Sequence, residues 1–213
     1  MRMMERAVRA GSQQTRRDIL LAASRLFAER GFAEVSAIEV AAAAGVFPNQ
    51  VTYYFGGKDG LFVEAAGRLI LEAGQAAEIA AQKAKSVRDY KKTLAASVLG
   101  PGLPAVLAFI EAMLIARRRP DLAPQIKATL DRLHEEGARA SSELVVRKRW
   151  QMKTSPMIGA QNFWATITGV ALQMVASGAT TIGSGVDALA LVELNLDDGQ
   201  AGADNSRPKR SRS

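Results

Sequence analysis

The chain has 213 residues, a formal net charge of +7 at pH 7, one histidine and no cysteine. Without cysteine it can form neither disulfides nor thiolate metal sites, and one histidine makes no metal site. Its 48% apolar and 23% charged residues are ordinary for a soluble globular protein, and the basic excess favours polyanionic partners. The first 18 residues contain no apolar segment of signal-peptide length, so we expect a cytoplasmic protein.

The first 58 residues predict a small helical domain. Residues 1–14 are expected to form a mobile basic arm, and Thr15 is expected to cap a first helix that ends at Gly31. Arg16 lies in the first turn of that helix, where the helix dipole disfavours a cation, so we assign it to phosphate contact. The alternative is that Arg16 is simply solvated.

Residues 36–58 predict two short helices joined by a tight turn. Ser36 and Glu39 have the spacing of a capping box, which begins the first of them. Gly45 ends it, because glycine adopts the left-handed conformation at little steric cost. Pro48 suits the first turn of the second helix, which runs to about Phe55.

The second of these helices has two different sides. Pro48, Val51 and Phe55 fall on one side at helical spacing, and are expected to face the core. The opposite side and its margins are polar and uncharged, and carry Asn49, Gln50, Thr52, Tyr53 and Tyr54. Asn and Gln amides pair with adenine in a major groove, while tyrosine hydroxyls and Lys58 reach phosphates. The alternative is an ordinary solvated helix face.

Residues 15–62 resemble the N-terminal domain of the TetR family of transcriptional regulators. The matching landmarks keep the family's spacing without a gap: Thr15-Arg16, Ile19-Leu20, Ala22-Ala23, Leu26-Phe27-Ala28, Gly31, Ser36, Ala44-Gly45-Val46, Phe55, Lys58 and Leu61-Phe62. The sequence departs from the family at two positions. Phe47 stands where a Ser or Thr usually caps the recognition helix, and Thr52 stands where a tyrosine is usual.

The remainder of the chain is also helical in pattern. Helices are expected over residues 58–85, 86–100 (capped by Ser86), 104–119, 121–150 (capped by Asp121), 155–178 (capped by Ser155) and 186–196, followed by a disordered tail, 197–213. No strand is expected.

Residues 154–186 carry no charge. Scattered Gln, Asn and Thr side chains argue against a membrane span, so a helix buried on most sides is expected. Its apolar seam predicts a dimer interface together with the last helix, made of Ala160, Phe163, Ile167, Val170, Met174, Leu189 and Val192.

The sequence therefore predicts an all-α protein of about nine helices. Residues 1–58 are expected to bind DNA and residues 59–196 to bind a ligand and dimerise. The resemblance implies a ligand-responsive repressor acting as a homodimer on a palindromic double-stranded DNA operator, with a small-molecule effector and no membrane partner. The predicted DNA-binding residues are Arg16, Ser36, Pro48, Asn49, Gln50, Thr52, Tyr53, Tyr54 and Lys58. The candidate ligand-binding residues are Phe109, Met113, His134 and Phe163.

Two other classes of protein are weighed against a DNA-binding repressor. Phe47 and Thr52 motivate a dimeric small-molecule-binding or interaction protein whose helix-turn-helix no longer recognises an operator. An enzyme is not expected, because the sequence offers no nucleophile with a base partner, no glycine-rich phosphate loop, no cofactor motif and no metal-ligand spacing.

Overall fold

The computed structural model describes residues 2–178 together with residues 196 and 197. This part of the chain forms eight α-helices, a 3-10 helix and a pair of two-residue strands. The elements are α1 (Arg2–Arg30), α2 (Ala37–Ala43), α3 (Asn49–Phe55), α4 (Lys58–Ala81), α5 (Val87–Leu99), α6 (Leu103–Arg118), η1 (Pro120–Leu122), α7 (Ala123–Lys148), β1 (Gln151–Met152), α8 (Pro156–Ala176) and β2 (Leu196–Asp197). The all-α prediction is confirmed.

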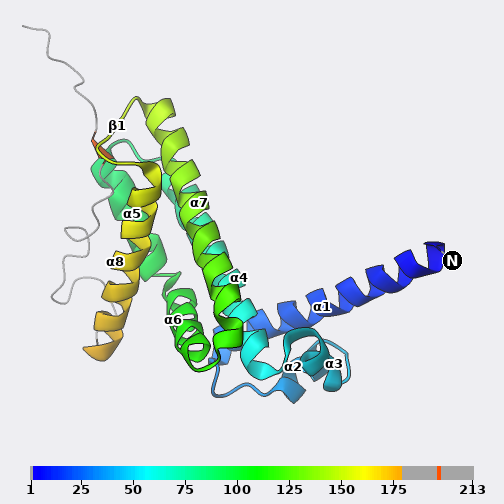
Figure 1. Cartoon of the computed structure of the whole chain (residues 1–213). Helices are drawn as coiled ribbons and strands as arrows, with labels where there is room; N and C mark the ends of the chain where they lie inside the picture. The colour runs from blue at the N-terminus through cyan, green and yellow to red at the C-terminus, as the bar shows by residue number, and fades with distance from the viewer. Residues whose placement is uncertain (1, 179–195, 198–213) are drawn as a thin grey trace, which may run out of the picture.

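The helices form two groups that α4 joins. Helices α1, α2 and α3 lie together at one end, where the N-terminal half of α1 projects away from the rest of the chain (Figure 1). Helix α4 packs against α1 and α3 at its start and against α5, α6 and α7 along its length, and α8 packs on α7. A shift of α4 therefore reaches both groups.

Three phenylalanines form the centre of the first group. Phe27 of α1 meets Phe62 of α4 edge to face with 5.0 Å between ring centroids, and Phe32 lies 4.7 Å from the same ring. Val40 of α2 and Val51 of α3 are fully buried beside them. This packing fixes the short helices α2 and α3, which would be too short to persist in water alone.

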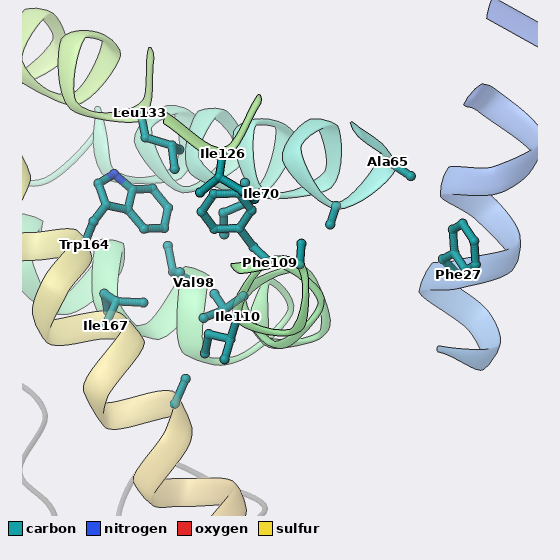
Figure 2. Close-up of a cluster of buried hydrophobic side chains, with 14 of the residues drawn as sticks. Phe27, Ala65, Ile70, Val98, Phe109, Ile110, Ile126, Leu133, Trp164 and Ile167 are labelled. Atoms are coloured by element: carbon teal, nitrogen blue, oxygen red, sulfur yellow. The ribbon is translucent and has the colours of Figure 1, made fainter. Parts of the chain in front are cut away.

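The core of the second group is drawn from α4, α5, α6, α7 and α8. Figure 2 shows Trp164 and Ile167 of α8 pointing toward Val98 of α5, with Ile70 of α4 and Phe109 of α6 close by. All five side chains are buried.

Two glycines let α4 approach its neighbours closely. A Cβ at Gly67 would lie 2.7 Å from Oγ1 of Thr129, and one at Gly74 would lie 3.0 Å from the ring of Trp164. Glycine weakens a helix interior by roughly 1 kcal/mol relative to alanine. At these two positions that loss of helix stability allows the close packing of α4 against its neighbours.

The expected N-terminal arm is wrong. Residues 2–14 continue α1 as helix, and Thr15 lies inside that helix rather than capping it. The Thr15 hydroxyl donates to the carbonyl of Gly11 one turn earlier, at 3.0 Å. The reason is that no proline or left-handed glycine interrupts the chain before Gly31, which does end the helix, with φ of 76°.

Three further expectations need correction or lie outside the described residues. Asp121 does not cap the long helix: η1 intervenes, and Asp121 pairs with Arg119 at 2.8 Å. Strands β1 and β2 pair antiparallel, so Leu196 and Asp197 are extended rather than helical or disordered. The remainder of the expected last helix, including Leu189 and Val192, and the tail from residue 198 lie outside the described residues. The caps predicted at Ser86 and Ser155 are confirmed.

Candidate functional site

Helix α2 begins with the predicted capping box. The Ser36 backbone N–H donates to Oε2 of Glu39 at 2.8 Å, and the Glu39 N–H donates back to the Ser36 hydroxyl at 3.2 Å. Arg30 of α1 adds an ion pair with Glu39 at 3.0 Å. The hydrogen bonds from Ser36 and then from Arg30 lower the pKa of Glu39 to about 2. This cap fixes the start of α2 against α1.

The turn between α2 and α3 follows the predicted pattern. Gly45 is left-handed, with φ of 68°, and Val46 donates its N–H to the carbonyl of Ala41 at 2.9 Å. Pro48 is the residue before α3, and the helix has no side-chain cap at that end. Phe47 stands where a capping hydroxyl would lie, and its side chain is 78% exposed.

Helix α3 separates an inward from an outward side, largely as predicted. Val51 and Phe55 are buried, whereas Asn49, Thr52 and Tyr53 are exposed. Tyr53 is 80% exposed, so its ring and hydroxyl are both accessible to a partner. Pro48 was expected on the inward side and is exposed instead, because it lies just before the helix begins.

Tyr54 and Gln50 occupy the margins of this outward side and are half-buried. The Tyr54 hydroxyl lies 2.9 Å from the Ser12 hydroxyl of α1, and its ring meets Tyr53 edge to face at 4.9 Å. Tyr54 therefore ties α3 to the projecting part of α1 and supports the Tyr53 ring from behind. The sequence did not predict the helical extension of α1, and therefore did not predict the contact between Tyr54 and Ser12.

The two predicted phosphate-binding cations both lie over aromatic rings. The Arg16 guanidinium is 4.8 Å from the Phe55 ring centroid and pairs with Glu64 of α4 at 2.5 Å. Nζ of Lys58 lies 4.2 Å from the Phe32 ring centroid. Arg16 thus joins α1, α3 and α4, and its partner Glu64 was not predicted from the sequence. Lys58 is half-exposed at the start of α4, directly after α3.

A cavity of about 840 Å³ lies in the second helix group. Residues of α4, α5, α7 and α8 line it, together with Arg16 and Leu20 of α1 and Met152 of β1. Of the four predicted ligand-binding residues, only Phe163 is among them. Phe109 belongs to the core, Met113 packs against that core, and His134 is half-buried on α7 outside the cavity. Burial lowers the pKa of His134, so this histidine favours its neutral form.

The wall of the cavity contains a polar pair, the buried Tyr90 and the half-buried Glu78, that the sequence did not predict. The Tyr90 hydroxyl of α5 donates to Oε2 of Glu78 on α4 at 2.9 Å. Desolvation raises the pKa of Glu78 to about 7, against the smaller opposing effect of the Tyr90 hydrogen bond. Desolvation and the Glu78 charge also raise the pKa of Tyr90, so its hydroxyl stays protonated as a donor. Nothing in the local sequence of either helix distinguishes these two residues from ordinary surface positions.

The raised pKa of Glu78 predicts a pH dependence of stability. The folded protein holds this proton more tightly than the unfolded chain does, so the stabilising contribution is complete below pH 4.5 and is lost as pH rises through about 7. Glu78→Gln should remove that dependence while still accepting the Tyr90 hydrogen bond. Urea unfolding of both proteins from pH 4.5 to pH 8 checks this. If the difference in free energy of unfolding between the two proteins stayed constant across that pH range, the prediction would be contradicted.

Neither a metal-binding cluster nor a single membrane-spanning helix is found in the described part of the chain. No cluster of His, Asp or Glu within it is suited to hold a metal ion. No single helix there is long and apolar enough to cross a membrane, and α5 and α6 reach that apolarity only as a pair bent by 67°.

Two protein-family models match this chain, one in each helix group. The model described as "Bacterial regulatory proteins, tetR family" matches residues 19–65, and that described as "Bacterial transcriptional repressor C-terminal" matches residues 87–193. The HTH-type transcriptional regulator BetI of Brucella abortus (strain 2308) is 27% identical over 137 residues, which are 63% of this chain and 69% of that protein.

Solved structures agree with these matches. The crystal structure of a transcriptional regulator from Rhodococcus sp. RHA1 is 40% identical, with a TM-score of 0.72 over 84% of this chain and 93% of the other. The multidrug binding protein EbrR, solved with imidazole, is 28% identical, with a TM-score of 0.54 over 83% of this chain and 87% of the other. The chain belongs to the TetR family of DNA-binding transcriptional regulators.

Proposed function

We propose that this protein is a ligand-responsive repressor that binds a palindromic operator as a homodimer. The observation that carries the proposal is the outward side of α3, where Asn49, Thr52 and Tyr53 are exposed on a helix whose other side is anchored in the core. Residues 1–58 act on DNA, and residues 59–196 bind the effector and the second protomer.

The nine predicted DNA-binding residues divide by exposure and contacts. Asn49, Thr52 and Tyr53 are free to face bases, and Asn49 suits adenine through its bidentate amide. The half-exposed Lys58 contacts phosphate. The other five stand at the border of the interface, where they position the helices or touch the backbone: Arg16, Ser36, Pro48, Gln50 and Tyr54.

The exposed side of α8 suits the second protomer. Ile158, Ala165, Leu172 and Val175 are exposed and follow one side of the helix, and residues 154–186 contain no Asp, Glu, Lys or Arg. All five described residues of the predicted seam are buried inside the protomer, so we propose the exposed side in place of that seam: Ala160, Phe163, Ile167, Val170 and Met174. The interface is therefore shifted to the opposite side of the same helix.

The effector would act through α4. This helix lines the cavity along its middle and begins directly after α3, so a change in its tilt moves the recognition helix. A ligand that binds one tilt better than the other shifts the population toward it. The two recognition helices then no longer match half-sites spaced about 34–36 Å apart. EbrR is described as a multidrug binding protein, which supports a small-molecule effector by analogy.

Selection from random duplexes tests the proposal. Enrichment of a palindromic site by the full-length protein supports it. The missing side-chain cap and exposed Phe47 at the start of α3 favour the alternative, a ligand-binding protein without operator recognition. That alternative holds if no sequence is enriched under low-salt conditions where general DNA binding is measurable.

We expect Asn49→Ala and Tyr53→Ala to weaken binding to the selected operator by about 1–3 kcal/mol each, because each removes one base contact. Neither side chain supports the core, so thermal stability should stay near that of the parent protein. Fluorescence anisotropy at fixed salt measures the affinity. Operator affinity unchanged in both variants would show that this side of α3 does not read DNA.

We expect Lys58→Met to weaken binding to all duplexes alike. Methionine keeps a flexible chain of similar length over the Phe32 ring and removes the charge that lies on that ring. The slope of log K against log salt should become shallower by about one unit per protomer, because one phosphate contact is lost. Lys92→Met, on the exposed surface of α5, is the matched control and should leave the slope unchanged. An altered sequence preference with a constant slope would contradict the assignment.

A further inference from the structure

The charges that line the cavity are mostly paired with one another. Four arginines and five glutamates of the described residues contribute to its wall. Three ion pairs account for six of them: Arg16 with Glu64, Arg68 with Glu72, and Arg132 with Glu136. Arg139 and Glu143 lie one turn apart on the exposed surface of α7, a spacing at which opposite charges attract each other. Glu78 is the remaining carboxylate.

Glu78 is the one cavity glutamate of the described residues whose hydrogen-bond partner is a tyrosine hydroxyl, and aromatic side chains lie in the same cavity wall. The Tyr90 hydroxyl occupies Oε2, and no described residue forms a hydrogen bond or an ion pair with Oε1. The same wall also contains apolar and aromatic side chains, among them Trp164 and Phe163 of α8 and Leu94 of α5. The Trp164 ring, seen in Figure 2 beside Leu133, supplies a π face for a cation.

We infer that the cavity takes a hydrophobic organic ammonium ion whose N–H groups donate to Oε1 of Glu78. A half-buried carboxylate without a cationic partner is costly, and an ammonium group restores a charge-assisted hydrogen bond. The apolar wall holds the hydrocarbon part of the same molecule. The inference rests on the proposed effector role of this cavity and names the chemical class of the effector.

The ligand's charge is the property to test, so two probes of the same shape are compared. 4-Phenylbutylammonium and 4-phenylbutanol differ only in NH₃⁺ against OH. Calorimetric titration of the full-length protein at about pH 8, where Glu78 is ionised, should show the ammonium binding roughly tenfold tighter or more. Equal affinity for the two probes overturns the inference without any variant.

Variants then locate the effect. Glu78→Gln should abolish the preference for the ammonium and leave the affinity for the alcohol within about threefold, since only the charged contact is lost. Glu143→Gln is the matched control on the cavity's exposed rim and should keep the preference. Glu78→Asp retains the charge and should therefore keep part of the preference for the ammonium. A preference that survives in Glu78→Gln, or disappears in Glu143→Gln alone, overturns the assignment.

Operator binding of the same preparations separates this inference from the proposed function. If the protein binds its selected operator but shows no preference between the two probes, the ammonium inference fails and the repressor proposal stands. If the preference for the ammonium is present but no operator is selected, the cavity is assigned correctly and the repressor proposal fails.

Discussion

Leu172→Glu should convert the dimer to a monomer and abolish tight operator binding, while the protomer stays folded. Leu172 is 47% exposed on the uncharged side of α8, so a glutamate there remains hydrated in the monomer. The fold should lose no more than about 0.5 kcal/mol. In a two-fold symmetric dimer the substitution brings two carboxylates into one apolar interface. Without the second half-site, the avidity of the dimer is lost.

Ile167→Glu is the matched variant on the opposite side of the same helix. Ile167 is fully buried against the protomer's own core, so the charge has no hydrated position and the protomer should lose about 4 kcal/mol or more. Sedimentation and circular dichroism distinguish the two outcomes. Leu172→Glu should give a folded species near 22.7 kDa, and Ile167→Glu should give reduced helix content. A folded dimer in Leu172→Glu would move the interface away from this side of α8.

Gly60→Ala should destabilise the junction between the two helix groups by about 3 kcal/mol or more, because α4 and the end of α3 are in direct contact there. A Cβ at Gly60 would lie 1.9 Å from the carbonyl oxygen of Phe55, which is backbone and cannot rotate away. It would also lie 3.6 Å from the Leu122 side chain, which limits movement of α4 in that direction. We therefore expect the recognition helix to be displaced and operator affinity to fall together with stability.

Gly11→Ala is the control for this substitution. A Cβ at Gly11 meets nothing within 4 Å, so alanine should stabilise α1 by roughly 0.5–1 kcal/mol through helix propensity. Thermal unfolding of both variants measures the difference. A Gly60→Ala variant within about 1 kcal/mol of the parent would show that α3 and α4 can separate at little cost.

The sequence determined the local structure of the recognition unit. The Ser36–Glu39 capping box, the left-handed Gly45 and the inward pair of Val51 and Phe55 were all predicted correctly. Each depends on interactions within a few residues, or on a helical repeat with one clearly apolar side. The same reasoning placed Asn49 and Tyr53 on the outward side.

The orientation of α8 was decided only by tertiary structure. This helix carries no charge on any side, so periodicity identified a seam but not which partner the seam meets. Ile167 and its neighbours along the seam are buried against the protomer's own helices, and the exposed side is apolar as well. A hydrophobic pattern reports that a side is buried, and contains no information on whether the covering atoms belong to the same chain.

The polar pair in the cavity wall and the position of the Arg16 side chain also depend on contacts between distant segments of the chain. Glu78 and Tyr90 come together only because α4 and α5 pack side by side, and Arg16 meets Glu64 across 48 residues of sequence. A glutamate on a helix surface looks the same in sequence whether it faces water or a cavity. Desolvation, which raises the pKa of Glu78, depends on the atoms around the carboxyl group and so exists only once the helices have packed.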